Sequence, residues 1–537
     1  MSETIIYTAR RILTMAPHQP VATHVAVRDG RILAVGDVDC AAPWGGGRID
    51  DRFADRIMLP GFVEGHAHLM EGGLWRYAYL GYRNRQAPDG VWWAGLTTNE
   101  AIVQRLRDVP GPGPAIGWGF DPIFMSDQPL SRADLDRVSA DRPVAVLYSS
   151  LHVLVCNTVA LKMAGYLDGA EVDGLIRDGA GQPTGELREM AAMFPVLRRL
   201  GVDFRTLTGG AAVLAAFGQS ARRAGVTTTT DLFSAQTEAD LAELQTIVEG
   251  EDYPIRLVPA IGVTEGDPVE LAAMMARMAA KSGPKLRLGA VKLMTDGSIQ
   301  GYSARLRWPG YVNGAPNGMW NTPPATIRAL VEGFHSAGVQ MHIHVNGDEA
   351  SEVVIEALAG AIAKGGPRDH RHILQHGQLM DAAQFRRAAE LGLGVNLFAN
   401  HLYHFGDQHY ALTVGPDRAN RMNACRSALD AGLNLAIHSD APVTPLSPLF
   451  TAWCAVKRQT ASGRVLGAEQ AITVAEALNA ITLGAAWTLR MDHQIGSIET
   501  GKFADFTLLD QDPTEVDPMA LKDIAVTDTV LAGRVTA

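Results

Sequence analysis

The chain has 537 residues, of which 47% are hydrophobic and 20% charged, so it can bury a large core and is neither disordered nor low in complexity. Its formal net charge is −11 and its longest basic runs are arginine pairs, which excludes a polyanion-binding footprint. The four cysteines lie far apart, which argues against a disulfide framework. Without a secretory signal or an apolar run of about 18 residues, we expect a cytoplasmic protein with no nucleic-acid or membrane partner.

The two ends of the chain share one pattern. The first 60 residues predict short strands, with an Asp-Gly hairpin signal at Asp29 and Gly30. The stretch 490–537 again shows glycine-punctuated strands. We therefore expect residues 1–60 plus 490–537 to form one small β-domain built from both termini.

The middle of the chain, residues 61–489, repeats a different unit, in which an apolar strand ends in a polar or glycine cluster and a helical segment follows. This alternation favours βαβ units and a parallel sheet, and about eight or nine strands fit a (β/α)8 barrel. A stretch at about 71–145 is rich in Trp, Pro and Gly and predicts an insertion over the barrel top. The predicted barrel strands are LPGFVEGHAHL, AVLYSSLHVL, GVTTTTDL, IRLVPAIGV, LRLGAVKLMTDG, GVQMHIHVNGD, RHILQHGQ, GVNLFAN and LNLAIHSDAP.

Histidines and acids fall at the C-terminal ends of these predicted strands, where barrel enzymes keep their active sites. His66 and His68 close the first strand, and residues i and i+2 of a strand face the same side, so both rings can grip one divalent metal. A single buried histidine is more often a core residue than a ligand. Together with His344, His376 and Asp440, each at another strand end, these histidines predict a metal site. His342 shares the face of His344, so the sequence leaves open which of the two is the ligand.

Lys292 lies inside an apolar strand, where an unpaired ammonium group is costly to bury. In one interpretation Asp296 or Asp440 neutralises it. In the other, CO2 has carboxylated the lysine, and the carbamate bridges two metals.

Six ordered motifs resemble the amidohydrolase superfamily, specifically the YtcJ-like or amidohydrolase-3 branch that includes N-substituted formamide deformylase. The motifs are LPGFVEGHAHL, VKLMTDGS, HIHVNGDEA, HILQHGQ, HSDAPV and GSIETGKFADFTLLD, so the resemblance covers essentially the whole chain. Two departures, Glu64 in the first motif and HVNGDEA in place of HAIGDRA, leave the ligand positions untouched.

The resemblance implies a distorted (β/α)8 barrel with a composite β-sandwich from both ends. It also implies His66, His68 and Asp440 on one metal, with His344 and His376 on a second. Carboxylated Lys292 would bridge the two ions, and zinc is the usual metal. A mononuclear site with an unmodified Lys292 stays open as the alternative, and a homo-oligomer is a family-level expectation.

Such a site predicts hydrolysis of an amide-like C–N bond in a small, apolar or aromatic substrate, with Asp440 as general base and then general acid. The alternatives are an ester, a lactone or a cyclic imide or ureide at the same site, or a non-enzymatic regulator that retains the fold. The candidate substrate-binding residues are His152, His401, His404 and Trp118.

Overall fold

The computed structural model describes residues 3–125, 129–234, 237–366 and 368–536. Its centre is an eight-stranded parallel sheet in the order β20-β19-β18-β17-β16-β15-β14-β5. The first and last strands meet at their C-terminal ends, because the Asp440 N–H donates to the His66 carbonyl and the His68 N–H to the Ala441 carbonyl. The sheet is therefore the predicted barrel. Its strands are β5 (Phe62–Glu64), β14 (Val226–Ser234), β15 (Arg256–Val263), β16 (Ala290–Met294), β17 (Met341–Val345), β18 (Ile373–His376), β19 (Gly394–Leu397) and β20 (Asn434–Ile437).

Helices connect the barrel strands, as the predicted alternation of strands and helical segments implies. The residues Gly225, Gly338 and Gly392 directly after the C-caps of α7, α10 and α12 have φ of 77°, 75° and 67°, as expected for left-handed caps. The helices are α7 (Ala211–Arg223), α8 (Leu241–Val248), α9 (Pro268–Ala279), α10 (Pro324–Ser336), α11 (Asp348–Gly365), α12 (Ala382–Glu390), α13 (Asn400–Gln408), α14 (Gly415–Arg421), α15 (Cys425–Asp430), α16 (Pro448–Lys457), α17 (Val474–Ala480) and α18 (Leu483–Thr488).

A second sheet combines strands from both ends of the chain, in the order β23-β22-β21-β4-β1-β2-β3. The Asp-Gly signal is confirmed: Asp29 and Gly30, both with positive φ, turn β2 into β3. Tyr7 packs against Phe53 and Phe506, so the two termini share one apolar core. The strands are β1 (Ile5–Leu13), β2 (Val21–Arg28), β3 (Arg31–Gly36), β4 (Arg48–Pro60), β21 (Phe506–Leu509), β22 (Val526–Leu531) and β23 (Arg534–Val535).

A third sheet, in the order β12-β13-β11-β10-β9-β6, lies between the first and second barrel strands in sequence. It corrects one strand prediction, because the segment AVLYSSLHVL contributes β10 and β11 to this sheet and not to the barrel. An apolar run buried on both faces does not specify which sheet it joins. The elements are β6 (Ala78–Tyr79), α2 (Asn99–Arg107), β9 (Ala115–Phe120), α3 (Arg132–Asp136), β10 (Val144–Tyr148), β11 (Val153–Cys156), α4 (Thr158–Met163), β12 (Leu175–Arg177), β13 (Pro183–Arg188) and α5 (Glu189–Arg199).

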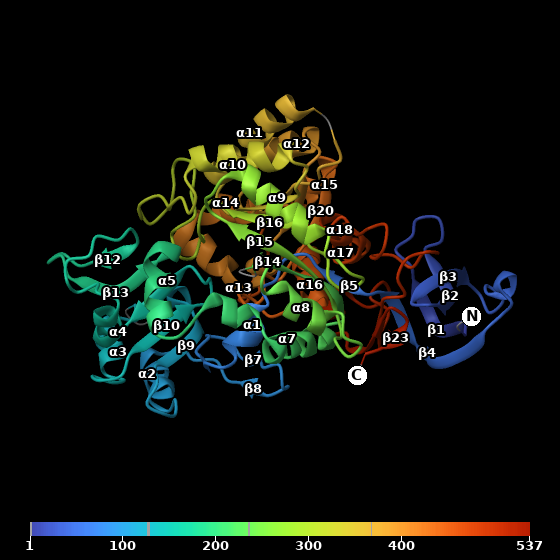
Figure 1. Cartoon of the computed structure of the whole chain (residues 1–537), viewed down its shortest axis with the longest axis horizontal. Coiled ribbons are helices and arrows are strands. Elements are labelled where there is room, and N and C mark those ends of the chain that lie inside the picture. Colours follow the sequence, from blue (N-terminus) through green and yellow to red (C-terminus); the bar gives the residue numbers. More distant parts are fainter. Residues whose placement is uncertain (1–2, 126–128, 235–236, 367, 537) are drawn as a thin grey trace.

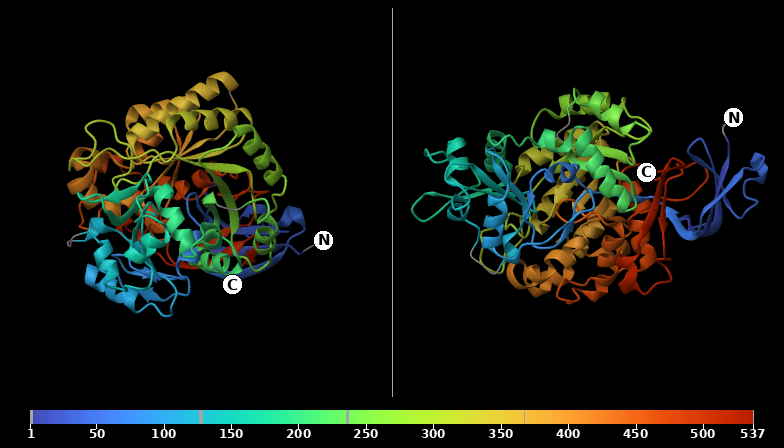
Figure 2. Two further views of the ribbon diagram at one scale, coloured as in Figure 1. Left: turned by 60° about the vertical axis from the view of Figure 1, so that its left-hand side comes forward. Right: turned by 90° about the horizontal axis from the view of Figure 1, so that it is seen from below.

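The barrel lies between the other two sheets, with the sheet of β9 and β10 on one side and the sheet of both termini on the other (Figure 1). The view from below shows the same arrangement, with the barrel between the two other sheets (Figure 2). Within the described residues, every helix is too short or too polar to cross a membrane. The short elements α1 (Met70–Leu74) and α6 (Phe204–Thr208) lie beside α7 between the insertion and the barrel.

A buried ion pair ties the barrel to the second sheet. The guanidinium of Arg256, at the start of β15, hydrogen-bonds to the Asp505 carboxylate just before β21, and both side chains are at most 3% exposed. We expect Asp505→Ala to lower the free energy of unfolding by about 3–5 kcal/mol, because it leaves a buried cation unpaired. The control Glu251→Ala removes an exposed pair with Arg534 and should cost at most about 1 kcal/mol. Urea denaturation measures both values. Equal effects of the two substitutions would contradict the stabilising role of the buried Arg256–Asp505 pair.

Candidate metal centre

The ends of the barrel sheet bring His66, His68 and Asp440 together. The backbone hydrogen bonds that close the barrel run between these same segments, so the side chains of the first and last strands converge. The Nε2 atoms of His66 and His68 lie 3.3 and 3.2 Å from Oδ1 of Asp440. Their ligand-type atoms all lie within 4.8 Å of one another, a spacing that suits a single metal ion.

His344 and His376 extend this cluster from the neighbouring strands β17 and β18. The His376 ring centroid lies 4.4 Å from that of His66 and 4.6 Å from that of His344. Nδ1 of His376 lies 3.6 Å from Oδ2 of Asp440. Lys292 of β16 lines the same cavity, and its Nζ has no hydrogen-bond partner among the described residues.

The electrostatics of the cluster suit metal ligands. Burial, together with the nearby charge of Lys292, holds the pKa values of His66 and His344 well below the usual range, so both rings are neutral with a free lone pair. Burial would raise the pKa of Asp440, but the hydrogen bond with His68 and the nearby charge of Lys292 hold it below its usual value, so this carboxyl is charged. Burial lowers the pKa of Lys292 to about 7.

Gln375 of β18 fixes the orientation of His66. Its Nε2 donates to Nδ1 of His342, and its Oε1 lies 2.7 Å from Nδ1 of His66. Nδ1 of His66 therefore carries the proton and Nε2 presents its lone pair to Asp440 and the cavity. His342, whose role the sequence left open, thus holds Gln375.

Several residues around the cavity adopt the left-handed backbone conformation that non-glycine residues rarely take. His376, Asp440 and Glu189 have φ of 72°, 54° and 62°. At His376 this departure from strand geometry lets two consecutive side chains, Gln375 and His376, both reach His66. Strained conformations of this kind cluster at functional sites.

All six predicted metal-ligand residues line one cavity of about 840 Å3 at the C-terminal ends of the barrel strands. Its walls combine polar groups with a set of apolar side chains. The apolar side chains that line it include Met70, Leu151, Met190, Phe194, Phe233, Met294 and Phe398.

His152 lies in this cavity and is held by a residue that the sequence did not single out. Nδ1 of His152 lies 2.7 Å from Oε2 of Glu189, at the start of α5, and Nδ2 of Asn321 donates to the same oxygen. Burial would lower the pKa of His152, but the charge of Glu189 and its hydrogen bond raise it above its usual value. The ring centroid of His152 lies 5.6 Å from that of His344, beside the predicted ligands.

The other three predicted substrate-binding residues have different positions. His401 lines the cavity, and its ring stacks on the rings of Phe405 and His409. His404 is absent from the cavity lining and packs on Tyr403 and Phe450. Trp118 is 1% exposed, outside the cavity lining, in the core of the third sheet. The structure therefore brings His152 and His401 to the site, but not His404 or Trp118.

Two buried side chains beside the cluster are not among the predicted site residues. Both ring nitrogens of His438 lack a hydrogen-bond partner among the described residues, and the ring stacks on His66 with centroids 4.6 Å apart. Glu64 accepts hydrogen bonds from the His66 N–H and from Ser439, and burial raises its pKa to about 8. His438 lies two residues before Asp440, so strand alternation was the signal for it.

The fold is a (β/α)8 barrel, and the cavity lies on the face where barrel enzymes keep their active sites. The model described as the amidohydrolase family matches residues 54–537, and the chain belongs to this family. The YtcJ protein of Bacillus subtilis is 28% identical over 89% of this chain and 88% of its own. The N-substituted formamide deformylase of Arthrobacter pascens is 26% identical over 99% of this chain and 98% of its own.

Among solved structures, a metal-dependent hydrolase of Pyrococcus horikoshii matches with a TM-score of 0.72 and 21% identity, over 96% of this chain and 99% of that one. This likeness concerns the fold. It confirms the predicted fold class, a distorted barrel with an additional sheet domain.

Proposed function

We propose that this protein is a metal-dependent amidohydrolase that cleaves a non-peptide C–N bond in a small substrate with an apolar or aromatic group. The observation that carries the proposal is the convergence of six ligand-type side chains from five barrel strands on one cavity. Neutral imidazoles beside a charged carboxylate are a donor set that suits zinc. The kinship with a formamide deformylase supports the choice of a C–N bond.

We propose that this cluster holds two ions. His66, His68 and Asp440 would hold the first, and His344 and His376 the second, with Asp440 close to both sets. Carboxylated Lys292 would bridge them; a single ion with an unmodified lysine is the alternative. A divalent ion bound here supplies hydroxide at neutral pH, since it lowers the pKa of a bound water towards about 7.

Two side chains of the protein would transfer the proton and stabilise the carbonyl oxygen. Asp440, charged and adjacent to His68, accepts the proton of the attacking water and passes it to the leaving nitrogen. His152, held through Nδ1 by Glu189, presents its other nitrogen to the cavity and donates to the carbonyl oxygen as charge develops there. The apolar walls exclude water and hold the apolar group of the substrate.

The carbamate would form from the neutral amine of Lys292. The lone pair of Nζ attacks the carbon of CO2, the N–C bond forms as one C–O π bond breaks, and the proton that leaves the nitrogen passes to solvent water. The absence of a hydrogen-bond partner for Nζ among the described residues leaves this lone pair free to react. The product is an anion, which replaces a costly buried ammonium group.

A substrate panel tests the bond type. The panel comprises N-formyl amines, N-acyl amino acids, anilides, aryl esters and lactones. We expect turnover of amides with an aromatic or apolar group, and kcat/KM should fall by about 10-fold or more when that group is reduced to a methyl, because apolar burial is lost. Turnover of the esters or lactones alone would make the C–N assignment wrong and favour the alternative. Biological activity without any turnover or metal would favour a regulator.

The hydrogen-bond chain from His342 through Gln375 to His66 gives a further prediction. Gln375→Leu should weaken metal binding by about 10- to 100-fold, because His66 loses the acceptor that fixes its tautomer. Gln375→Glu retains that acceptor and should keep more of the affinity. Competition with a chromogenic chelator measures both, and equal affinities in the two variants would contradict the orienting role.

A further inference from the structure

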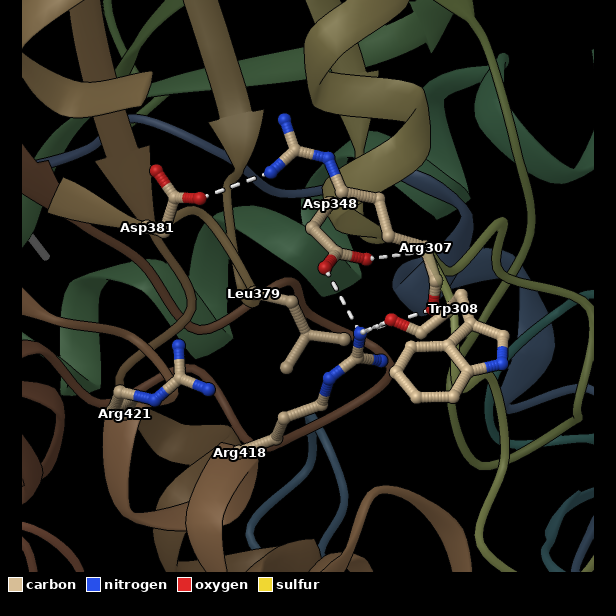
Figure 3. A pocket seen from close by; sticks show the side chains of 7 residues that line it. All are labelled: Arg307, Trp308, Asp348, Leu379, Asp381, Arg418 and Arg421. Carbon is tan, nitrogen blue, oxygen red and sulfur yellow. Dashed lines mark hydrogen bonds and ion pairs between the residues drawn. The ribbon is translucent and has the colours of Figure 1, made fainter. Parts of the chain in front are cut away.

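Two smaller cavities lie outside the proposed active site, and their charges differ. In the first, of about 220 Å3, the charged side chains neutralise one another: Arg307 pairs with Asp381, and Arg418 with Asp348 (Figure 3). Arg421 pairs with Asp417 on α14. This cavity therefore offers no uncompensated charge to a ligand.

The second cavity, of about 290 Å3, lies at the N-terminal ends of β15, β16 and β17, opposite to the end that carries the metal-ligand residues. Its walls are apolar and largely core side chains. They include Val258 of β15, Ala272 and Met275 of α9, and Leu288, Val339 and Leu489 from the loops, each at most 8% exposed. Arg287 and Arg490 add two cations to this apolar lining.

Arg287 is the uncompensated charge of this cavity. Throughout the described ranges its guanidinium has no hydrogen-bond or ion-pair partner. The neighbouring charges do not supply one: Arg490 donates to the carbonyls of Asp369 and His370, and Asp492 pairs with Arg371. Burial and the like charges of Arg490 and Arg371 lower the pKa of Arg287, and the charge of Asp492 offsets this only in part.

We propose that this cavity is an accessory binding site for a small monocarboxylate with a short apolar tail. The planar guanidinium of Arg287 matches a carboxylate in a two-pronged hydrogen bond, and the apolar walls take the tail. The cavity volume is just below the usual range of ligand pockets, so the ligand must be a small acid. The site is separate from the proposed metal centre and does not rest on the proposed function.

Calorimetric titration of the intact protein with hexanoate tests the proposal, with hexanamide as the uncharged analogue and hexyl phosphate as the second anion. We expect saturable binding of hexanoate that is weakened about 10- to 100-fold by Arg287→Gln, because a charge-assisted hydrogen bond is lost. Arg277→Gln on the outer face of α9, whose arginine pairs with Glu238, is the matched control and should bind as the wild type does. Hexanamide should bind at least about 10-fold more weakly than hexanoate.

Binding in the large cavity must be distinguished from binding here, since a carboxylate is also a metal ligand. His66→Ala should keep hexanoate binding. Loss in His66→Ala with retention in Arg287→Gln would place the ligand at the metal centre and overturn the proposal. Equal affinity for hexanamide, tighter binding of hexyl phosphate, or no saturable binding of hexanoate in the millimolar range would also overturn it.

Discussion

Asp440→Asn is expected to lower kcat by about 10^2- to 10^4-fold, the range that a positioned general base contributes. Asparagine keeps the shape of the side chain and an oxygen for a metal, but it cannot accept a proton. Asp440 lies within 3.3 Å of the Nε2 atoms of both His66 and His68, and its pKa below the usual range marks it as charged. The loss should therefore appear in kcat at every pH at which the wild type is active.

Two controls make this result specific. Asp417→Asn makes the same change on α14, where the carboxylate is 89% exposed, and should leave kcat unchanged. Metal content, measured on the same samples, separates loss of the base from loss of the ion. A kcat of Asp440→Asn within about three-fold of the wild type would contradict the role of Asp440.

Lys292→Met has the second largest expected effect. It removes the proposed bridging carbamate, so we expect about half the metal content and a fall in kcat/KM of about 100-fold or more, since several kcal/mol of charge stabilisation are lost. The free energy of unfolding should not fall, because methionine replaces a buried amine whose Nζ has no hydrogen-bond partner in the described chain. The variant is thus expected to fold.

The modification has a direct readout. Native mass spectrometry of the wild type should show one added CO2 per chain, lost on acidification and absent from Lys292→Met. A bare lysine at full metal loading would refute the carbamate and leave the single-ion alternative. Unfolding of Lys292→Met would show that the amine has a structural role instead.

The convergence of the predicted ligand residues on one cavity could be predicted from the sequence because its signal is local. His66, His344, His376 and Asp440 each lie at or just after the C-terminal end of an apolar strand, and parallel strands in a barrel bring these ends to one face. The pattern of strands and helices therefore sufficed to place these side chains in one cavity.

The remaining residues of the site depend on tertiary contacts that no local pattern encodes. Glu189 reaches His152 across 37 residues, from the end of the third sheet. Gln375 would face away from His66 in a regular strand if His376 faced it, and only the positive φ of His376 lets both approach. Trp118 was predicted to bind substrate but lies in a hydrophobic core. A tryptophan in an insertion can pack in a core or line a pocket, and the sequence pattern does not distinguish the two.

Measurement of metal content and turnover on the same samples tests the central claim most directly. The chelated wild type should lose its activity and regain it in proportion to added zinc. Recovery should be complete at two zinc ions per chain, or at one ion per chain if the site is mononuclear. His66→Ala should recover little activity at equal zinc, whereas the exposed control His493→Ala should behave as the wild type. Full turnover by the metal-free protein, or by His66→Ala without bound metal, would contradict the account.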